Sequence, residues 1–122
     1  GLILDAIVTV PQGLSGRTKR GHDQLKSLGR LVGNELGIPV LRPLRFEDNK
    51  KEQKKFNRSQ RLFNIRKNLR PLTEMSCSGL KLLLLDDVMT TGATLDGCAE
   101  VLKKMGASRV FSLTIASVEG HT

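Results

Sequence analysis

Two adjacent carboxylates and a cluster of hydroxyl groups follow the most apolar run of the chain. Asp86 and Asp87 come directly after the leucines of 82–85, and a short polar segment with small residues comes next. That segment contains Thr90, Thr91, Gly92, Ala93 and Thr94. Hydroxyl groups and free backbone N–H groups at the start of a helix bind phosphate, and carboxylates accept hydrogen bonds from the vicinal hydroxyls of a ribose. The spacing therefore predicts a site for a ribose 5-phosphate.

Competing explanations of this segment are weaker. Asp87 or Thr91 alone could cap the following helix, but one cap does not account for six polar or glycine positions in order. The sequence has no P-loop, because Gly16-Arg17-Thr18 lacks both the lysine and the upstream glycine. A dinucleotide-binding GxGxxG is also missing from the sequence.

The elements around this segment alternate between strands and helices. An apolar run at 80–85 predicts a buried strand, helical spacing at 94–105 ends at Gly106, and 109–116 is typical of a last strand. Upstream, 2–10 and 38–41 are expected strands, and 23–36 is an expected amphipathic helix. The alternation predicts a single α/β domain over 1–122, with a mainly parallel sheet and helices on both faces. Because Asp86 and Asp87 end their strand, we expect both at the surface.

Composition excludes several classes of protein. The chain has 122 residues, and 39% of them are hydrophobic, which is typical of one globular domain. No apolar run reaches the roughly 20 residues that cross a bilayer, and the first segment lacks the features of a signal peptide. Cys77 and Cys98 form no CxxC pair, so we expect no zinc site and no protein-ligated metal. A cytoplasmic protein with reduced thiols and no membrane insertion is the expectation.

The positive charge is concentrated in one block. The chain has a net charge of +8, and residues 42–70 hold eleven Lys and Arg against three acids. Such a block is either a solvated surface or a surface for an anion, namely nucleic acid or a phosphorylated small molecule. With four Phe and neither Trp nor Tyr in the chain, binding by aromatic base stacking is disfavoured.

The polar segment resembles a known motif. Residues 82–94 are similar, at every position, to the phosphoribosyl-diphosphate (PRPP) motif of type I phosphoribosyltransferases. Residues 20–24 resemble the RGFNQ signature of the ComF (competence protein F, amidophosphoribosyltransferase-like) family. That family's Q-x4-R-x2-R-x2-N segment is matched by Gln53, Arg58, Arg61 and Asn64. Together the three motifs cover essentially the whole chain.

The resemblance implies a fold and a site. It implies a type I phosphoribosyltransferase fold, in which Asp86 and Asp87 hold the ribose hydroxyls and 90–94 wraps the 5-phosphate. The loop 11–21 would contact the diphosphate of PRPP, with Mg²⁺ in between, through its cations Arg17, Lys19 and Arg20. Residues 46–72 would form a hood that we expect to be mobile, with Arg58 and Arg61 able to close on the diphosphate or on an acceptor.

Two functions follow from the resemblance. The first is a phosphoribosyltransferase, a glycosyltransferase of nucleoside metabolism, although no general base is evident, the acceptor is not readable and the site could instead bind PRPP as a regulator. The second is a non-catalytic component of DNA uptake in competence, which would bind single-stranded DNA and a competence helicase.

The sequence departs from the family pattern in two places. His22 and Asp23 replace the family's usual Phe and Asn. The family's N-terminal zinc module is absent and the chain starts at a strand, so we expect a fragment or a shortened form.

Overall fold

The computed structural model describes residues 3–11, 14, 19–47, 57–72, 76–87 and 92–115. In chain order the elements are β1 (Ala6–Thr9), α1 (Lys19–Leu36), β2 (Val40–Leu41), β3 (Leu44–Phe46), α3 (Arg58–Asn68), β4 (Leu69–Pro71), β5 (Lys81–Asp87), α4 (Gly92–Lys104) and β6 (Arg109–Ile115). None of the described helices has the length and apolar character to cross a membrane.

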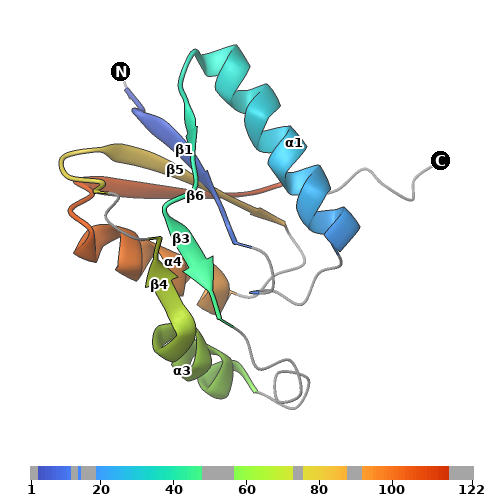
Figure 1. The fold of residues 1–122 in the computed structure, drawn as a ribbon, viewed down its shortest axis with the longest axis vertical. Coiled ribbons are helices and arrows are strands. Elements are labelled where there is room, and N and C mark those ends of the chain that lie inside the picture. The colour runs from blue at the N-terminus through green and yellow to red at the C-terminus, as the bar shows by residue number, and fades with distance from the viewer. Residues whose placement is uncertain are drawn as a thin grey trace.

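Four strands form the central sheet, in the order β2-β1-β5-β6, and every neighbouring pair is parallel. Helix α1 covers one face of this sheet and α4 covers the other (Figure 1). This confirms the predicted α/β fold, a parallel sheet flanked by helices, and it agrees with the expected type I phosphoribosyltransferase arrangement. The antiparallel ribbon of β3 and β4, next to α3 and α4, was not predicted from the sequence.

Strand β5 explains why the leucine run is nearly continuous. Successive side chains of a strand point to opposite faces, and both faces of this strand are covered. Leu82 and Leu84 pack in the cluster on the α4 side, whereas Leu85 packs on the α1 side, and all three are completely buried. On the α4 side, Cys98 and Leu102 of the helix are also completely buried. Cys98 is therefore a core residue.

Helix α1 departs from the prediction in two ways. It begins at Lys19 rather than at Asp23, because its first turn is polar and apolar spacing cannot reveal it. Leu31 follows the apolar spacing but is 57% exposed. The helix instead lies on its glycines: a Cβ at Gly29 would be 2.8 Å from Thr9 Cγ2 of β1. This close approach rotates the leucine side of the helix partly away from the sheet.

The C-terminal half agrees closely with the sequence pattern. Helix α4 begins at Gly92, two residues before the predicted start, and ends before Gly106, whose φ of 101° is the left-handed conformation of a helix C-cap. The loop before β5 is hydrogen-bonded to this cap, since the Gly79 N–H donates to the Gly106 carbonyl over 2.9 Å. Cys77 of that loop is buried, and burial raises the pKa of its thiol.

Candidate functional site

The strand order has a switch point between β1 and β5, and we use the word crevice for the region beyond the carboxyl ends of these two strands. These two strands are parallel neighbours in the middle of the sheet. The chain leaves β1 through α1 on one face toward β2, and it leaves β5 through α4 on the other face toward β6. Where connections diverge in this way, ligands bind beyond the carboxyl ends of the strands. The carboxyl end of β5 carries Asp86 and Asp87, so the structure places the predicted acidic pair at this crevice.

Asp86 is buried in the sheet rather than placed at the surface. Its side chain has no exposed area, and its Cα is paired in register with Thr114 of β6. The expectation of two surface carboxylates is therefore wrong for Asp86, because β5 continues through both acids and is still covered there by neighbouring elements. Alternation along the strand places Asp86 on the face of Leu82 and Leu84, which is the face covered by α4. For Asp87 the structure gives the backbone position at the end of β5 and leaves its side chain undescribed.

The first turn of α4 lies on the same face as Asp86. It is formed by Gly92, Ala93 and Thr94, of which Ala93 is 0% and Thr94 3% exposed. The first N–H groups of a helix have no partner within the helix, and the helix dipole is positive there. This turn can therefore receive an anion beside a buried carboxylate. The predicted phosphate residues Thr90 and Thr91 lie outside the described residues.

The structure describes the predicted diphosphate-binding cations, Arg17, Lys19 and Arg20, only in part. Lys19 and Arg20 form the first turn of α1, not a loop, and this helix follows β1. Because β1 and β5 are parallel, the first turns of α1 and α4 lie toward the same end of the sheet, the end at which both strands finish. The backbone of Lys19 and Arg20 is thus at the end of the sheet where Asp86 lies, although their side chains are outside the described part. Arg17 is also outside it.

Part of the predicted hood is packed firmly against the core. Ile65 of α3 is buried, and a Cβ at Gly97 of α4 would lie 2.3 Å from its Cγ2. Beside this contact, the Arg66 guanidinium donates to the Glu100 carboxylate, with Nη2 2.9 Å from Oε2. This partner lowers the pKa of Glu100 and raises the pKa of Arg66. These contacts fix α3 on α4; whether segment 46–72 moves as a hood stays a prediction.

Helix α3 brings the predicted Arg58 and Arg61 toward the crevice. The two helices run in a similar direction, as the contacts of residue 65 with 97 and of residue 66 with 100 indicate (Figure 1). The first half of α3, which contains Arg58 and Arg61, therefore lies toward the end where α4 begins. The side chains of both arginines are outside the described part.

The start of α3 carries a signal in the sequence. Asn57 Oδ1 accepts from the Gln60 N–H over 2.8 Å, while the Asn57 N–H donates to Gln60 Oε1 over 2.9 Å. This reciprocal pair is a capping box, and the spacing Asn-x-x-Gln predicts it. The close approach at Gly97 had no such signal, because a glycine inside a helix does not reveal its partner.

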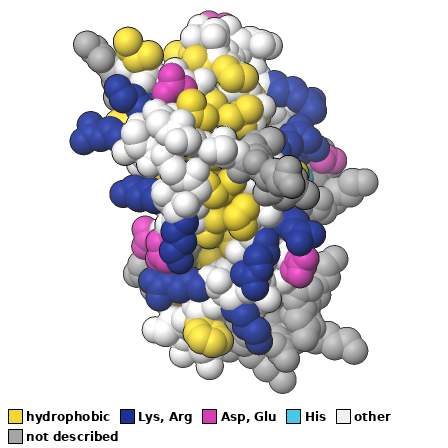
Figure 2. Space-filling model, turned by 60° about the vertical axis from the view of Figure 1, so that its left-hand side comes forward, with side chains coloured by type: hydrophobic (Ala, Val, Ile, Leu, Met, Phe, Trp, Pro, Cys, Tyr) yellow, Lys and Arg dark blue, Asp and Glu magenta, His cyan; other side chains and the backbone are white. Residues whose placement is uncertain are grey.

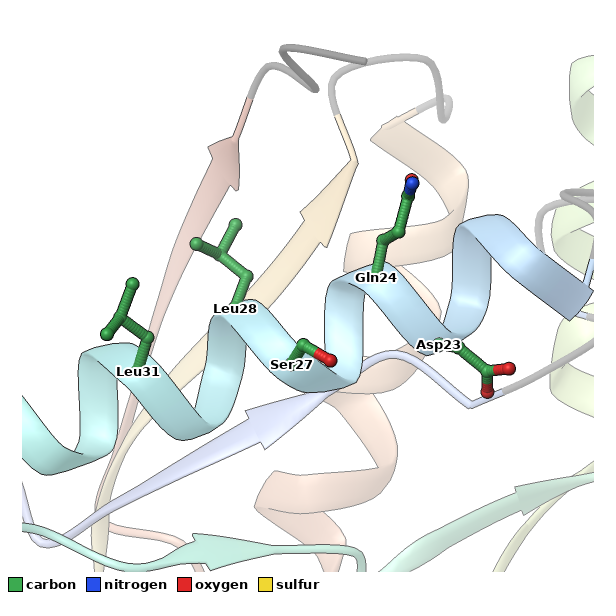
Figure 3. Close-up of a pocket in the computed structure, with 5 residues that line it drawn as sticks. All are labelled: Asp23, Gln24, Ser27, Leu28 and Leu31. Atoms are coloured by element: carbon green, nitrogen blue, oxygen red, sulfur yellow. The ribbon is translucent and has the colours of Figure 1, made fainter.

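The residues of the 20–24 motif divide between two sides of α1. His22 is buried, at 9% exposure, whereas Asp23 and Gln24 are exposed. Asp23 and Gln24 line a shallow depression on the flank of α1 together with Ser27, Leu28 and Leu31 (Figure 3). This depression is open along the helix and is a poor enclosure for a small ligand.

The basic block contains an arginine pair on the β3–β4 ribbon. Arg45 and Arg70 are direct partners in the antiparallel register, so their side chains project from the same face. Both are exposed, and Arg45 forms an exposed ion pair of 3.2 Å with Glu47. Lys and Arg side chains also gather at both margins of the face in Figure 2, on either side of a hydrophobic strip. Like charges directly opposite one another destabilise a ribbon, so this pair favours acidic groups beside it, such as Glu47, or an anionic partner.

The described residues contain no group of three or more His, Cys, Asp or Glu side chains that could hold a metal ion. Asp86 by contrast is a single oxygen donor group beside a helix N-terminus. Such a donor fits Mg²⁺ that arrives with a phosphate ligand, because this ion is usually held by one or two carboxylates together with substrate phosphates.

Comparison with known proteins gives one distant similarity. No protein-family model matches the chain. The chain is 28% identical over 110 residues to competence protein ComFC of Bacillus subtilis (strain 168). The match covers 89% of this chain and 43% of the relative, so the chain spans less than half the length of that protein. The resemblance to the ComF family, inferred from three sequence motifs, is confirmed by this finding: the chain is distantly similar to a competence protein of the ComF type.

Proposed function

We propose that the chain binds PRPP, or a related ribose 5-phosphate ligand, at the junction of β5 and α4 and acts as a phosphoribosyltransferase. The buried carboxylate of Asp86 carries this proposal. It lies at the carboxyl end of a central strand, on the face where the first turn of α4 is buried. A ribose 5-phosphate has hydroxyls for the acidic pair and, a few ångströms away, a phosphate for the helix N-terminus.

The roles of the residues follow from their positions. Asp86 and Asp87 would accept hydrogen bonds from the 2- and 3-hydroxyls of the ribose. The turn that begins α4 and the preceding hydroxyls would hold the 5-phosphate, and the first turn of α1 would face the diphosphate. Mg²⁺ bound through the diphosphate would neutralise the leaving group. The contribution of this chain is then to orient the ribose and to stabilise charge.

Calorimetry with PRPP and Mg²⁺ tests the site. Asp86→Asn keeps the size of a fully buried side chain but removes its charge, so the fold should persist while PRPP affinity falls at least about tenfold, the effect of losing a charge-assisted hydrogen bond. Asp96→Asn is the matched control, because Asp96 is an exposed residue of α4. Equal PRPP affinity in the two variants would contradict the proposal. Diphosphate release with a panel of amine and nucleobase acceptors then tests turnover.

A second candidate function is single-stranded DNA binding as a component of DNA uptake, in which a competence helicase would be the partner. The Arg45–Arg70 pair favours it, since two exposed guanidinium groups on one face of a ribbon offer adjacent positive charges to the phosphates of a nucleic-acid backbone. The name of the similar competence protein supports it further.

Fluorescence anisotropy with a labelled oligonucleotide separates this candidate from the first. Arg45→Gln combined with Arg70→Gln should weaken DNA binding and reduce its dependence on salt. Lys103→Gln combined with Lys104→Gln removes the same charge from exposed positions of α4 and is the control. Equal loss in both double variants would indicate a general charge effect, which contradicts a specific DNA surface on the ribbon. PRPP binding should be unchanged in both.

A further inference from the structure

The two edges of the central sheet are built differently. The edge strand β2 has only 2 residues, and it is bracketed by Pro39 and Pro43 and followed by Arg42. Short edge strands, prolines and charges prevent pairing with another chain. The other edge strand, β6, has 7 residues and no proline, and its only charged residue is the first, Arg109. Within the described residues, no strand pairs with the outer edge of β6.

The α1 side of β6 is apolar and incompletely covered. Phe111 and Leu113 are paired in register with Leu83 and Leu85, so they lie on the sheet face that α1 covers. Leu113 is 47% exposed. Helix α1 lies toward β1 and β2, because a Cβ at Gly33 would be 2.8 Å from the Ile38 carbonyl oxygen and 3.3 Å from Val40 Cγ2 of β2. Ile115 of β6 still packs on the cluster that includes Leu25 of α1, whereas Leu113 is left half exposed.

Two leucines of α1 lie on the same side of the sheet as Phe111 and Leu113. Leu28 and Leu31 project from the flank of α1 opposite the glycine contact with β2 (Figure 3). Exposed apolar side chains beside a strand edge that is unpaired within the described residues mark an interaction site.

We propose that β6 pairs antiparallel with β6 of a second copy of this chain, which joins two four-stranded sheets into one. The sequence of the strand is self-complementary about Ser112. On one face Phe111 would oppose Leu113 of the second copy, and the reverse pair would lie beside it. On the other face Ser112 would oppose its own equivalent, and Val110 would oppose Thr114. Aromatic–aliphatic cross-strand pairs stabilise a sheet, and a two-fold axis requires such a self-complementary surface.

The charges agree with this arrangement. An antiparallel pairing separates the two Arg109 residues by six strand positions, or roughly 20 Å, so they do not repel each other appreciably. An in-register parallel pairing would instead place the two Arg109 residues side by side.

Sedimentation equilibrium of the intact chain tests the dimer. The native chain should show a dimer that dissociates on dilution. Leu113→Lys places a charge opposite Phe111 twice in the interface and should weaken dimerisation by about tenfold or more. Phe63→Lys is the matched control, because Phe63 is a 69% exposed residue of α3, away from β6. A native chain that stays monomeric at all concentrations, or a dimer equally stable in both variants, overturns the proposal.

A disulfide test reports on the register and does not depend on Leu113. Residues directly opposite in an antiparallel pair have Cβ atoms about 4.5–5.5 Å apart, close enough for a disulfide after small adjustment. Ser112→Cys should therefore cross-link the dimer under mild oxidation, and the native Cys77 and Cys98, both buried, should not interfere. Thr114→Cys on the same face should not cross-link, since its equivalent would be four residues away. No cross-link with Ser112→Cys, or equal cross-linking of both variants, refutes the β6 pairing.

Discussion

Replacing Gly97 with alanine should destabilise the protein, contrary to the usual effect of this change in a helix. An added Cβ would lie 2.3 Å from Ile65 Cγ2 and 3.4 Å from Ile65 Cβ. Alanine gains about 1 kcal/mol over glycine in helix propensity, but overpacking of a buried contact costs roughly 1–3 kcal/mol. Since Ile65 is only 3% exposed and has little room to move, we expect a net loss of about 1 kcal/mol, the middle of the range that these two effects give.

The clash is with the methyl group on the branched Cβ of Ile65, so leucine at this position should relieve it. Ile65→Leu alone should cost less than about 1.5 kcal/mol, as volume-conserving changes do. The double variant should be more stable than the sum of the two single effects predicts, with a coupling of about 1 kcal/mol. Urea denaturation followed by circular dichroism measures all four proteins. A stabilised Gly97→Ala variant, or strictly additive effects, would refute the close packing of α3 on α4.

Two further predictions concern the free energy of unfolding. Arg66 lowers the pKa of Glu100 in the folded state, so the stability from this pair is present above the unfolded pKa of Glu and is lost as the pH falls through the folded pKa. The difference in stability between the native chain and Arg66→Gln should thus be small at pH 7, because solvent reaches both partners of the pair. Urea titrations should show this difference vanish on acidification, and a difference that grows in acid would contradict the prediction. Leu102→Ala should cost about 2–5 kcal/mol, whereas Leu31→Ala should cost well under 1 kcal/mol despite its periodic position. Thermal denaturation compares these two, and similar losses would show that α1 buries Leu31 in solution.

The sequence predicted the elements whose pattern is local. The leucine run and the hydroxyl-rich segment after it identified β5, its carboxyl end and the beginning of α4, because burial on both faces and helix initiation leave direct marks in composition. Gly106 marked the end of α4 in the same way. Polar helix turns leave no such mark, and for this reason the start of α1 at Lys19 was missed.

Contacts between distant segments were not readable from the sequence. The β3–β4 ribbon consists of 3-residue strands, which are too short for a periodic signal. The packing of Ile65 on Gly97 joins α3 to α4, and the residues of neither helix indicate that the other helix is its partner. Leu31 is exposed because the glycines of the same helix approach β1. Periodicity alone does not show whether the glycine side or the leucine side of the helix packs on the sheet.

The amino-acid sequence by itself determined the chemistry at the end of β5, since two acids followed by threonines and glycine suit a phosphorylated sugar in any parallel α/β fold. Only the tertiary structure decided how that chemistry is presented. It buried Asp86, because β6 and α4 cover the strand to its last residues. It also brought the carboxyl ends of β1 and β5 side by side, and within the described residues it left the 7-residue strand β6 at one edge of the sheet and the 2-residue strand β2 at the other. Strand order produces these features, and strand order is a property of contacts between residues far apart in the chain.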